Sequence, residues 1–173
     1  LASNSFSLDA VNDLPVRTAG NVSTLFLIED APLASMGLNG LTYSVGGGED
    51  ESAQTLTYTV TAVPDAALGT IYLADGETTV EAEQTLSIAE LQGLQFLAAP
   101  NAAGQASFSF TVADSGDGEN AITETVNLDI LGFNDTPVLP ATGISIPDAQ
   151  EDQAYSFSAG DLLNGVIDPD IQY

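Results

Sequence analysis

Apolar residues alternate with serine, threonine and other small polar residues along three long segments of the chain, 55–63, 106–113 and 121–131. A period of two is typical of a β-strand that buries one face and exposes the other. Glu124 is the one charged residue on the apolar face of the third segment. The residues that this pattern places inside the protein are Leu56, Tyr58, Val60, Phe108, Phe110, Val112, Ile122, Val126, Leu128 and Ile130.

Shorter apolar segments predict five further strands, at 6–11, 22–28, 41–45, 70–74 and 94–98. A helical turn fits the pattern at 87–94, where Gly93 limits its length. Clusters of Gly, Pro, Asn and Asp separate the strands, as they do in proteins built from two antiparallel sheets packed face to face. The sequence therefore predicts an all-β fold of the β-sandwich class.

The charge of the chain is strongly unbalanced. Its 173 residues include 25 Asp and Glu but one basic residue, Arg17, and no His, which gives a net charge of −24. Nucleic acids and anionic membranes are bound through cationic side chains, so neither is expected as a partner, whereas cations are. Hydrophobic residues make up 44% of the chain, which favours a folded core over a disordered acidic tail.

Several reactive residue types are missing from the sequence. Cys, His and Lys are all absent, so the chain lacks disulfides, thiolate metal ligands and the usual nucleophile–base pairs, and we expect no enzymatic activity. No apolar run approaches the ~18–20 residues that cross a bilayer, and the N-terminus does not resemble a signal peptide, so we expect a soluble protein. Because the chain begins with LASNSF and not with Met, we expect a fragment or a processed product.

Two similar six-residue segments, VNDLPV at 11–16 and FNDTPV at 133–138, share four residues, and their Asn-Asp pairs are 122 residues apart. A Glu-Asp pair recurs at the same distance, at 29–30 and at 151–152. Two independent features that share one offset indicate a tandem repeat.

A third acidic group extends the repeat. The triplet EDE at 49–51 has its counterpart in DPD at 168–170, which lies 119 residues later because the intervening loop is shorter. We therefore expect a window cut from a tandem array. Its predicted parts are the last strand of a preceding repeat at 1–12, a complete repeat at 13–134, and the N-terminal part of the next repeat at 135–173.

These phrases, in this order, resemble the cadherin-like repeats of very large bacterial surface adhesins, of the proteoglycan-type or tandem cadherin-like variety. The segments LTYTVTAVPDAALGTIYLADG (56–76) and ASFSFTVADSGDG (106–118) contribute to the resemblance, which covers nearly the whole chain. It implies immunoglobulin-like or cadherin-like Greek-key β-sandwiches in tandem. It also implies calcium ions that stiffen the junctions between repeats.

The resemblance further implies that Asn and acidic residues converge at one end of each repeat to bind Ca²⁺, which prefers oxygen ligands. In the first repeat GEDES replaces the commoner Asp-x-Asp form. The loop at 113–120, with Asp114 and Asp117, is either a hairpin turn or a minor calcium loop. The other implied ligands are Asn12, Asp13, Glu29, Asp30, Glu49, Asp50, Glu51, Asn134, Asp135, Glu151, Asp152, Asp168 and Asp170.

A simpler interpretation exists for all of these charges. Scattered acids such as Glu77, Glu81, Glu83 and Glu90 are interpreted as solvated surface charges. The junction acids admit the same interpretation, as charges that keep a secreted protein soluble or suit a salt-rich habitat. The calcium interpretation is favoured for them because they recur with the period of the repeat.

The predicted function is that of a calcium-stabilised structural extender in a secreted or surface-anchored bacterial adhesin or filament, active in cell adhesion or biofilm formation. Adjacent repeats of the same chain, or neighbouring subunits, are the expected partners. The alternative is a β-sandwich binding module that recognises a glycan or a partner protein. An exposed aromatic or polar patch on one sheet face would favour the alternative.

Overall fold

The structure is a computed structural model that describes residue 9 and residues 11–146 and 148–170. The chain divides into two compact units, unit 1 (Leu1–Leu131) and unit 2 (Gly132–Tyr173). Of the strand predicted at 6–11, only residues 9 and 11 are described, and neither belongs to a strand. Most of the segment 1–12 assigned to a preceding repeat lies outside the described residues.

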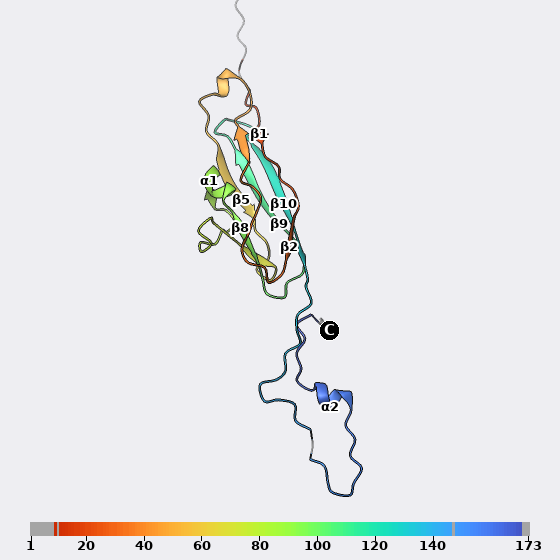
Figure 1. The fold of residues 1–173 in the computed structure, drawn as a ribbon. Coiled ribbons are helices and arrows are strands. Elements are labelled where there is room, and N and C mark those ends of the chain that lie inside the picture. The colour runs from red at the N-terminus through yellow and green to blue at the C-terminus, as the bar shows by residue number, and fades with distance from the viewer. Residues whose placement is uncertain (1–8, 10, 147, 171–173) are drawn as a thin grey trace, which may run out of the picture. The chain divides into compact units, whose positions relative to one another are not determined.

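A five-stranded sheet is the largest element of unit 1 (Figure 1). Its strands, in spatial order, are β2 (Leu25–Ile28), β10 (Ala121–Leu131), β9 (Gly104–Ala113), β5 (Thr57–Ala62) and β7 (Thr85–Leu86). All neighbours in this sheet are antiparallel except β2 and β10, which are parallel. The first strand of this sheet therefore lies beside the last one and runs in the same direction.

Two smaller sheets complete the strands of unit 1. A three-stranded sheet has the order β3 (Ala34–Ser35), β8 (Gln95–Ala98) and β6 (Gly69–Tyr72), and β1 (Val16–Ala19) pairs with β4 (Thr42–Ser44). All of these pairs are antiparallel. The described chain is therefore mainly β, as the alternation of its residues predicts.

The described helices are short. They are a single turn of 3-10 helix, η1 (Glu49–Glu51), and the α-helices α1 (Ile88–Gln92) in unit 1 and α2 (Ala159–Leu163) in unit 2. In α1 the Ser87 side chain accepts the Glu90 N–H while the Glu90 carboxylate accepts the Ser87 N–H, a capping box that fixes where the helix begins. The predicted helical turn at 87–94 is confirmed, and Gly93 ends it as expected.

The core of unit 1 confirms the predicted inward faces. Phe108 of the five-stranded sheet and Phe96 of the three-stranded sheet belong to one buried cluster, so the two sheets share a core. Of the residues predicted to face inward, Leu56 and Ile122 are partly buried. The others are buried: Tyr58, Val60, Phe108, Phe110, Val112, Val126, Leu128 and Ile130.

Glu124, the exception in the pattern, contacts the single basic residue of the chain. Its carboxylate lies 3.7 Å from Arg17 Nε and accepts a hydrogen bond of 3.3 Å from the Tyr43 hydroxyl. Burial raises the pKa of Tyr43 above its usual range, and the negative charge of Glu124 raises this pKa further. An inward-facing acid is tolerated here because both a cation and a hydroxyl group reach it.

Unit 2, taken by itself, has little regular structure among its described residues. Val138 and Ile167 exchange two backbone hydrogen bonds of 2.7 and 3.0 Å across an isolated antiparallel bridge. None of the described residues of this unit is fully buried. No helix in the described part of the chain is long and apolar enough to cross a membrane.

Candidate functional site

A small acidic cavity of about 210 Å³ lies at the end of unit 1 where its described chain begins. Three segments meet there: the strand-free segment before β1, the loop around η1, and the loop between β9 and β10. The residues that line the cavity are Val11, Asn12, Asp50, Glu51, Gln54 and Asp117.

Asn12 ties these three segments together. Its Nδ2 donates to the Glu119 carbonyl oxygen at 3.0 Å and to Asp114 Oδ2 at 3.4 Å. Its Oδ1 accepts a hydrogen bond from Gln54 Nε2 at 2.8 Å. The amide of Asn12 is therefore held in a fixed orientation at the edge of the cavity.

Glu51 is the most unusual residue of the cavity, because its carboxylate is buried without a full set of partners. The residue is 2% exposed, and its Oε1 accepts the backbone N–H of Asp13 at 2.5 Å. Within the described residues its Oε2 has no hydrogen-bond partner, and neither has Oε1 of Gln54. A buried carboxylate oxygen without a partner is costly, so this site favours a cation or another donor beside it.

The glycine run before η1 explains how Glu51 reaches this position. Gly47 has φ of 50°, and a Cβ built on it would lie 2.5 Å from Glu51 Oε2. A Cβ on Gly46, with φ of 84°, would lie 2.3 Å from the carbonyl oxygen of Leu14. Side chains at these two positions would displace the carboxylate or the segment before β1. The glycines therefore allow both groups to approach the backbone of this loop closely.

The loop between β9 and β10 is a structured turn. Asp114 is buried, and its Oδ1 accepts the Gly116 N–H at 2.9 Å, while its own N–H donates to the Asn120 carbonyl oxygen at 2.9 Å. Asn120 Nδ2 donates back to the carbonyl oxygens of Asp114 and Gly116, both at 3.3 Å. These bonds match the turn interpretation of Asp114, whereas Asp117 faces the cavity.

The same arrangement recurs at the start of unit 2. Asn134 Nδ2 donates to the Asp135 carbonyl oxygen at 2.8 Å, as Asn12 Nδ2 donates to the Asp13 carbonyl oxygen at 3.2 Å. The Asp135 N–H donates to Asp170 Oδ2 at 2.5 Å, as the Asp13 N–H donates to Glu51.

In both units, therefore, a carboxylate from later in the chain accepts the backbone N–H of the Asp in the Asn-Asp pair. In unit 2 that acid is further oriented, because the Asp170 N–H donates to Asp168 Oδ1 at 3.2 Å. Sequence positions that are 122 and 119 residues apart therefore play matching parts in the two units.

In unit 1 the Glu-Asp pair lies apart from the Asn-Asp pair. Glu29 follows β2, and its N–H donates to the Leu131 carbonyl oxygen at 3.1 Å, at the end of β10. The cavity lies at the other end of β10, whose 11 residues span about 35 Å. Asn12 contacts Glu119, which precedes β10, whereas β2 ends beside the last residue of β10, so Glu29 and Asp30 lie at the far end of unit 1 from Asn12.

Both Glu-Asp pairs share a local conformation. Asp30 has φ of 56° and Asp152 has φ of 62°, a left-handed conformation that is uncommon for residues other than glycine. In unit 2, Glu151 and Asp152 form an exposed turn.

The described residues hold no group of three or more carboxylates arranged to bind a metal ion. Glu49 and Asp50 are exposed on η1, with Asp50 at the cavity. What the cavity offers is mixed: one buried carboxylate oxygen, amide oxygens and exposed acids. Oxygen donors of this kind suit Ca²⁺ better than they suit soft metals.

A second surface lies on the outer face of the five-stranded sheet. Phe26 of β2 is 68% exposed and pairs in register with Asp129 of β10. Ile28 and Leu131, also in register with each other, are exposed beside them. A groove of about 320 Å³ on the same strands is lined by Thr24, Gln105, Ala106, Asn127, Leu128 and Asp129.

The sequence alone missed Gln54 and Phe26 for different reasons. Gln54 follows the acidic triplet closely, but an uncharged amide gives no signal of its own. Phe26 lies in LFLI, where four consecutive apolar residues hide the period that would tell the inner face from the outer one.

No model of a known protein family matches the chain, and a search of curated proteins likewise finds no match.

Proposed function

We propose that the chain is a calcium-stabilised structural extender made of cadherin-like Greek-key β-sandwich repeats, from a secreted or surface-anchored bacterial adhesin or filament. In this proposal unit 1 is a complete repeat and unit 2 is part of the next one. Adjacent repeats or neighbouring subunits are its partners, and its role is structural and not enzymatic.

The observation that carries the proposal is the recurrence of one arrangement at the start of each unit. An Asn-Asp pair and the carboxylate that accepts its N–H occur as Asn12, Asp13 and Glu51 and again as Asn134, Asp135 and Asp170. Repeated surface charges do not need a shared hydrogen-bonded arrangement. A binding site that has to form in every repeat does need such a shared arrangement.

The cavity in unit 1 presents oxygen atoms, which are the type of ligand that calcium prefers. Glu51 and Gln54 have buried oxygens without partners, and Asp50 and Asp117 line the same cavity. Carboxylates that lie close together repel one another, and this repulsion destabilises the folded conformation at this end of unit 1 until a cation binds. Bound Ca²⁺ would supply the positive charge there, and binding would stabilise the folded repeat.

Calcium titration followed by thermal melting tests this proposal. The melting temperature of the unaltered chain is expected to rise with Ca²⁺, and Glu51→Gln is expected to weaken the apparent affinity by at least about tenfold, or roughly 1.4 kcal/mol. In chelator the variant should be no less stable, because an amide is less costly to bury than a charged carboxylate with one oxygen unpartnered.

Glu77→Gln is the matched control, since it removes the same charge from an exposed position outside the cavity. A melting temperature that ignores calcium, or an equal loss in both variants, contradicts the proposal. The stiffening of junctions has its own test. Small-angle scattering should give a larger maximum dimension in calcium than in chelator, and an unchanged dimension would reject that part.

A second candidate function is favoured by one observation, the exposed aromatic ring beside polar side chains on the outer sheet face. Phe26 can stack on the apolar face of a sugar ring, while Gln105, Asn127 and Asp129 offer donors and acceptors for its hydroxyl groups. The chain would then be a binding module for an uncharged glycan.

Binding to arrayed neutral oligosaccharides checks this candidate. Phe26→Ala should abolish binding, whereas Val63→Ala, which shortens an exposed apolar residue elsewhere, should not. If the unaltered chain binds no oligosaccharide in the presence of calcium, the glycan-binding candidate is rejected and the extender role is the one that remains.

A further inference from the structure

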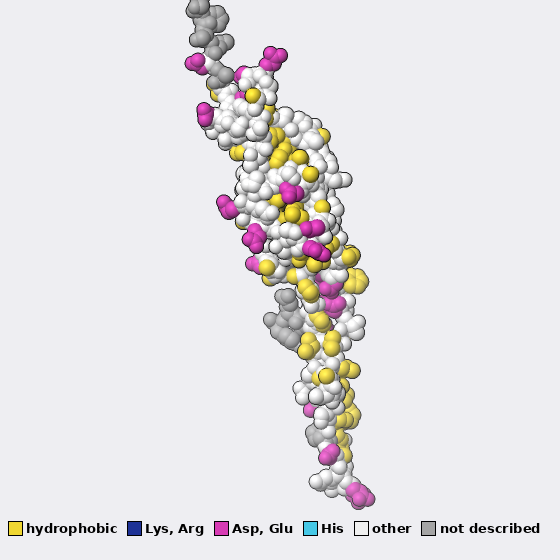
Figure 2. Space-filling model, turned by 90° about the vertical axis from the view of Figure 1, so that its left-hand side faces the viewer, with side chains coloured by type: hydrophobic (Ala, Val, Ile, Leu, Met, Phe, Trp, Pro, Cys, Tyr) yellow, Lys and Arg dark blue, Asp and Glu magenta, His cyan; other side chains and the backbone are white. Residues whose placement is uncertain are grey.

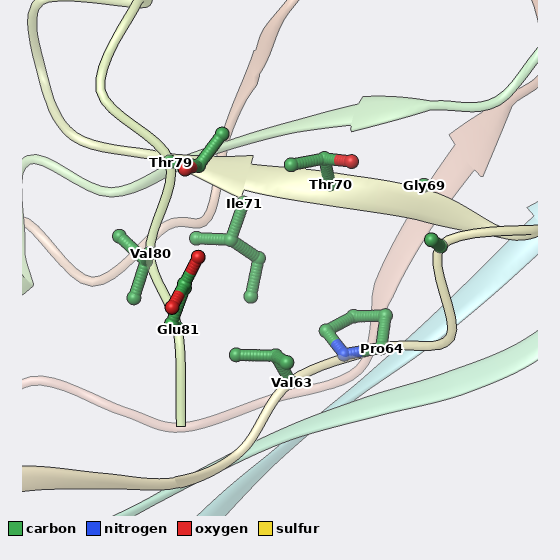
Figure 3. Close-up of a pocket in the computed structure, with 9 residues that line it drawn as sticks. Val63, Pro64, Gly69, Thr70, Ile71, Thr79, Val80 and Glu81 are labelled. Carbon is green, nitrogen blue, oxygen red and sulfur yellow. The ribbon is translucent and has the colours of Figure 1, made fainter. Parts of the chain in front are cut away.

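An apolar pocket of about 230 Å³ opens beside β6, away from both surfaces described above (Figure 3). Ile71 of β6, which is 1% exposed, and Val80 form its buried part. Val63 and Pro64, from the segment after β5, form the facing wall. Gly69 lies at one side of the pocket.

One carboxylate reaches this apolar pocket. Glu81 is exposed to solvent and lines the pocket together with Val80, Ile71 and Val63. Within the described residues, its carboxylate takes part in no hydrogen bond or ion pair, and the one ion pair joins Arg17 to Glu124. Thr70 and Thr79 supply the other side-chain oxygens of the lining.

The backbone around the pocket is fixed by hydrogen bonds. The Val80 N–H donates to the Ile71 carbonyl oxygen at 2.9 Å. The Glu81 N–H donates to Gln84 Oε1 at 3.1 Å. On the opposite side the Gly69 N–H donates to the Asp65 carbonyl oxygen at 3.2 Å. The pocket is therefore preformed, and an occupant need not order its walls.

Size and charge restrict the occupant. Pockets that enclose whole small molecules usually measure ~300–1,000 Å³, so this one suits a single side chain. Its apolar walls favour an aliphatic stem, and Glu81 favours a positive charge at the end of that stem. Lysine combines both in one side chain, with four methylene groups and a compact ammonium group.

We propose that this pocket binds a lysine side chain of a partner protein, with the stem against Ile71, Val63 and Val80 and the ammonium group at Glu81. The net charge of −24 attracts a basic partner over long range. The sequence contains no lysine, so the chain cannot fill the pocket with a lysine of its own. Three rotatable N–H donors can be shared between Glu81 and the threonine hydroxyls, whereas the rigid guanidinium fork of arginine needs a planar pair of acceptors.

Methyl-detected NMR of the intact chain tests the proposal with lysine capped at both ends as the probe. The methyl signals of Ile71, Val63 and Val80 should shift in a saturable manner. Capped norleucine, which has the stem but no charge, should bind at least about fivefold more weakly, and so should capped arginine.

Glu81→Gln should weaken lysine binding by a similar factor of about five. Glu83→Gln is the matched control, because Glu83 is exposed as Glu81 is but does not line the pocket. Unchanged methyl spectra of both variants without the probe show that the pocket remains folded. Equal binding of norleucine, tighter binding of arginine, equal effects of the two substitutions, or no saturable shift would each overturn the proposal.

Discussion

Single buried polar groups decide the chemistry of this molecule at the scale of the residue. Glu51 and Glu124 are both acids directed inward, yet their surroundings differ. Glu124 has Arg17 and the Tyr43 hydroxyl beside it, whereas Glu51 Oε2 has no hydrogen-bond partner in the described structure. A satisfied acid holds the fold together, and an unsatisfied acid indicates a place for a ligand.

Alkaline pH should destabilise the protein through Tyr43. Burial, and then the charge of Glu124, raise the pKa of its hydroxyl in the folded state. A raised folded pKa contributes stability that is complete below the unfolded value of about 10 and is lost as pH rises through the folded value. The free energy of unfolding should therefore fall above pH ~10, and it should fall less steeply in Tyr43→Phe.

Urea unfolding at a series of pH values measures this slope. Tyr155→Phe, a substitution in unit 2 at an exposed position, serves as the control and should keep the slope of the unaltered chain. A slope that is the same in Tyr43→Phe would show that this hydroxyl does not govern the alkaline limit.

At the scale of the element, long strands were predictable and short ones were not. The alternation at 121–131 gives β10 with its bounds, because eleven residues contain enough periods to be recognised. β3 and β7 have two residues each, too few to show any period. These strands exist because their neighbours offer hydrogen bonds, a tertiary cause that local sequence does not contain.

β6 depends on a glycine at its first residue, which gives a prediction about this element. Gly69 has φ of 148°, and a Cβ built there would lie 2.3 Å from Phe96 Cζ and 2.5 Å from the Leu97 carbonyl oxygen, both in β8. Gly69→Ala should therefore force β6 and β8 apart and destabilise unit 1 by roughly 2–4 kcal/mol.

Denaturant unfolding of Gly69→Ala and Gly40→Ala compares a crowded position with an open one. A Cβ on Gly40 meets its nearest atom at 3.9 Å, an ordinary contact. Gly40→Ala is expected to change the free energy of unfolding by less than about 1 kcal/mol. Similar losses in both variants would mean that the β6–β8 contact does not limit stability.

At the scale of the whole molecule, the acidic side chains are spread widely over the face of unit 1 drawn in Figure 2, so charge by itself does not mark a site. The sequence could identify which residues recur, such as Asn12 and Asn134. It could not show that Glu29 lies at the opposite end of unit 1 from Asn12, because that depends on which end of β10 each segment contacts. The position of a residue within a repeat can be taken from the sequence, whereas its position in space depends on how the strands pair.

The two units should differ in their hydrogen exchange. In unit 1 the paired strands β9 and β10 carry the buried residues Phe108, Phe110 and Val126, so their amides should exchange only through global unfolding. In unit 2 the described residues include no buried side chain, and the paired backbone is the Val138–Ile167 bridge. Its amides should exchange faster by several orders of magnitude.

Hydrogen exchange measured by mass spectrometry or NMR can compare the amides of unit 1 with those of unit 2. Comparable protection over 132–170 and over β9 would contradict the expectation. The measurement is best made both with calcium and with chelator, because bound calcium should slow exchange near Glu51 before it affects the centre of β9.

The parallel pairing of β2 with β10 has a mechanical consequence. When the two ends of unit 1 are pulled apart, tension enters ahead of β1 and leaves through the end of β10. Because β2 and β10 point the same way, the pull acts along both strands and loads their hydrogen bonds together, in shear, whereas antiparallel terminal strands would peel open one bond at a time. Four residue pairs, from Leu25 with Leu128 to Ile28 with Leu131, carry that load. We therefore expect the resistance of unit 1 to stretching to depend on these four pairs at the side of the sheet more than on the size of its core.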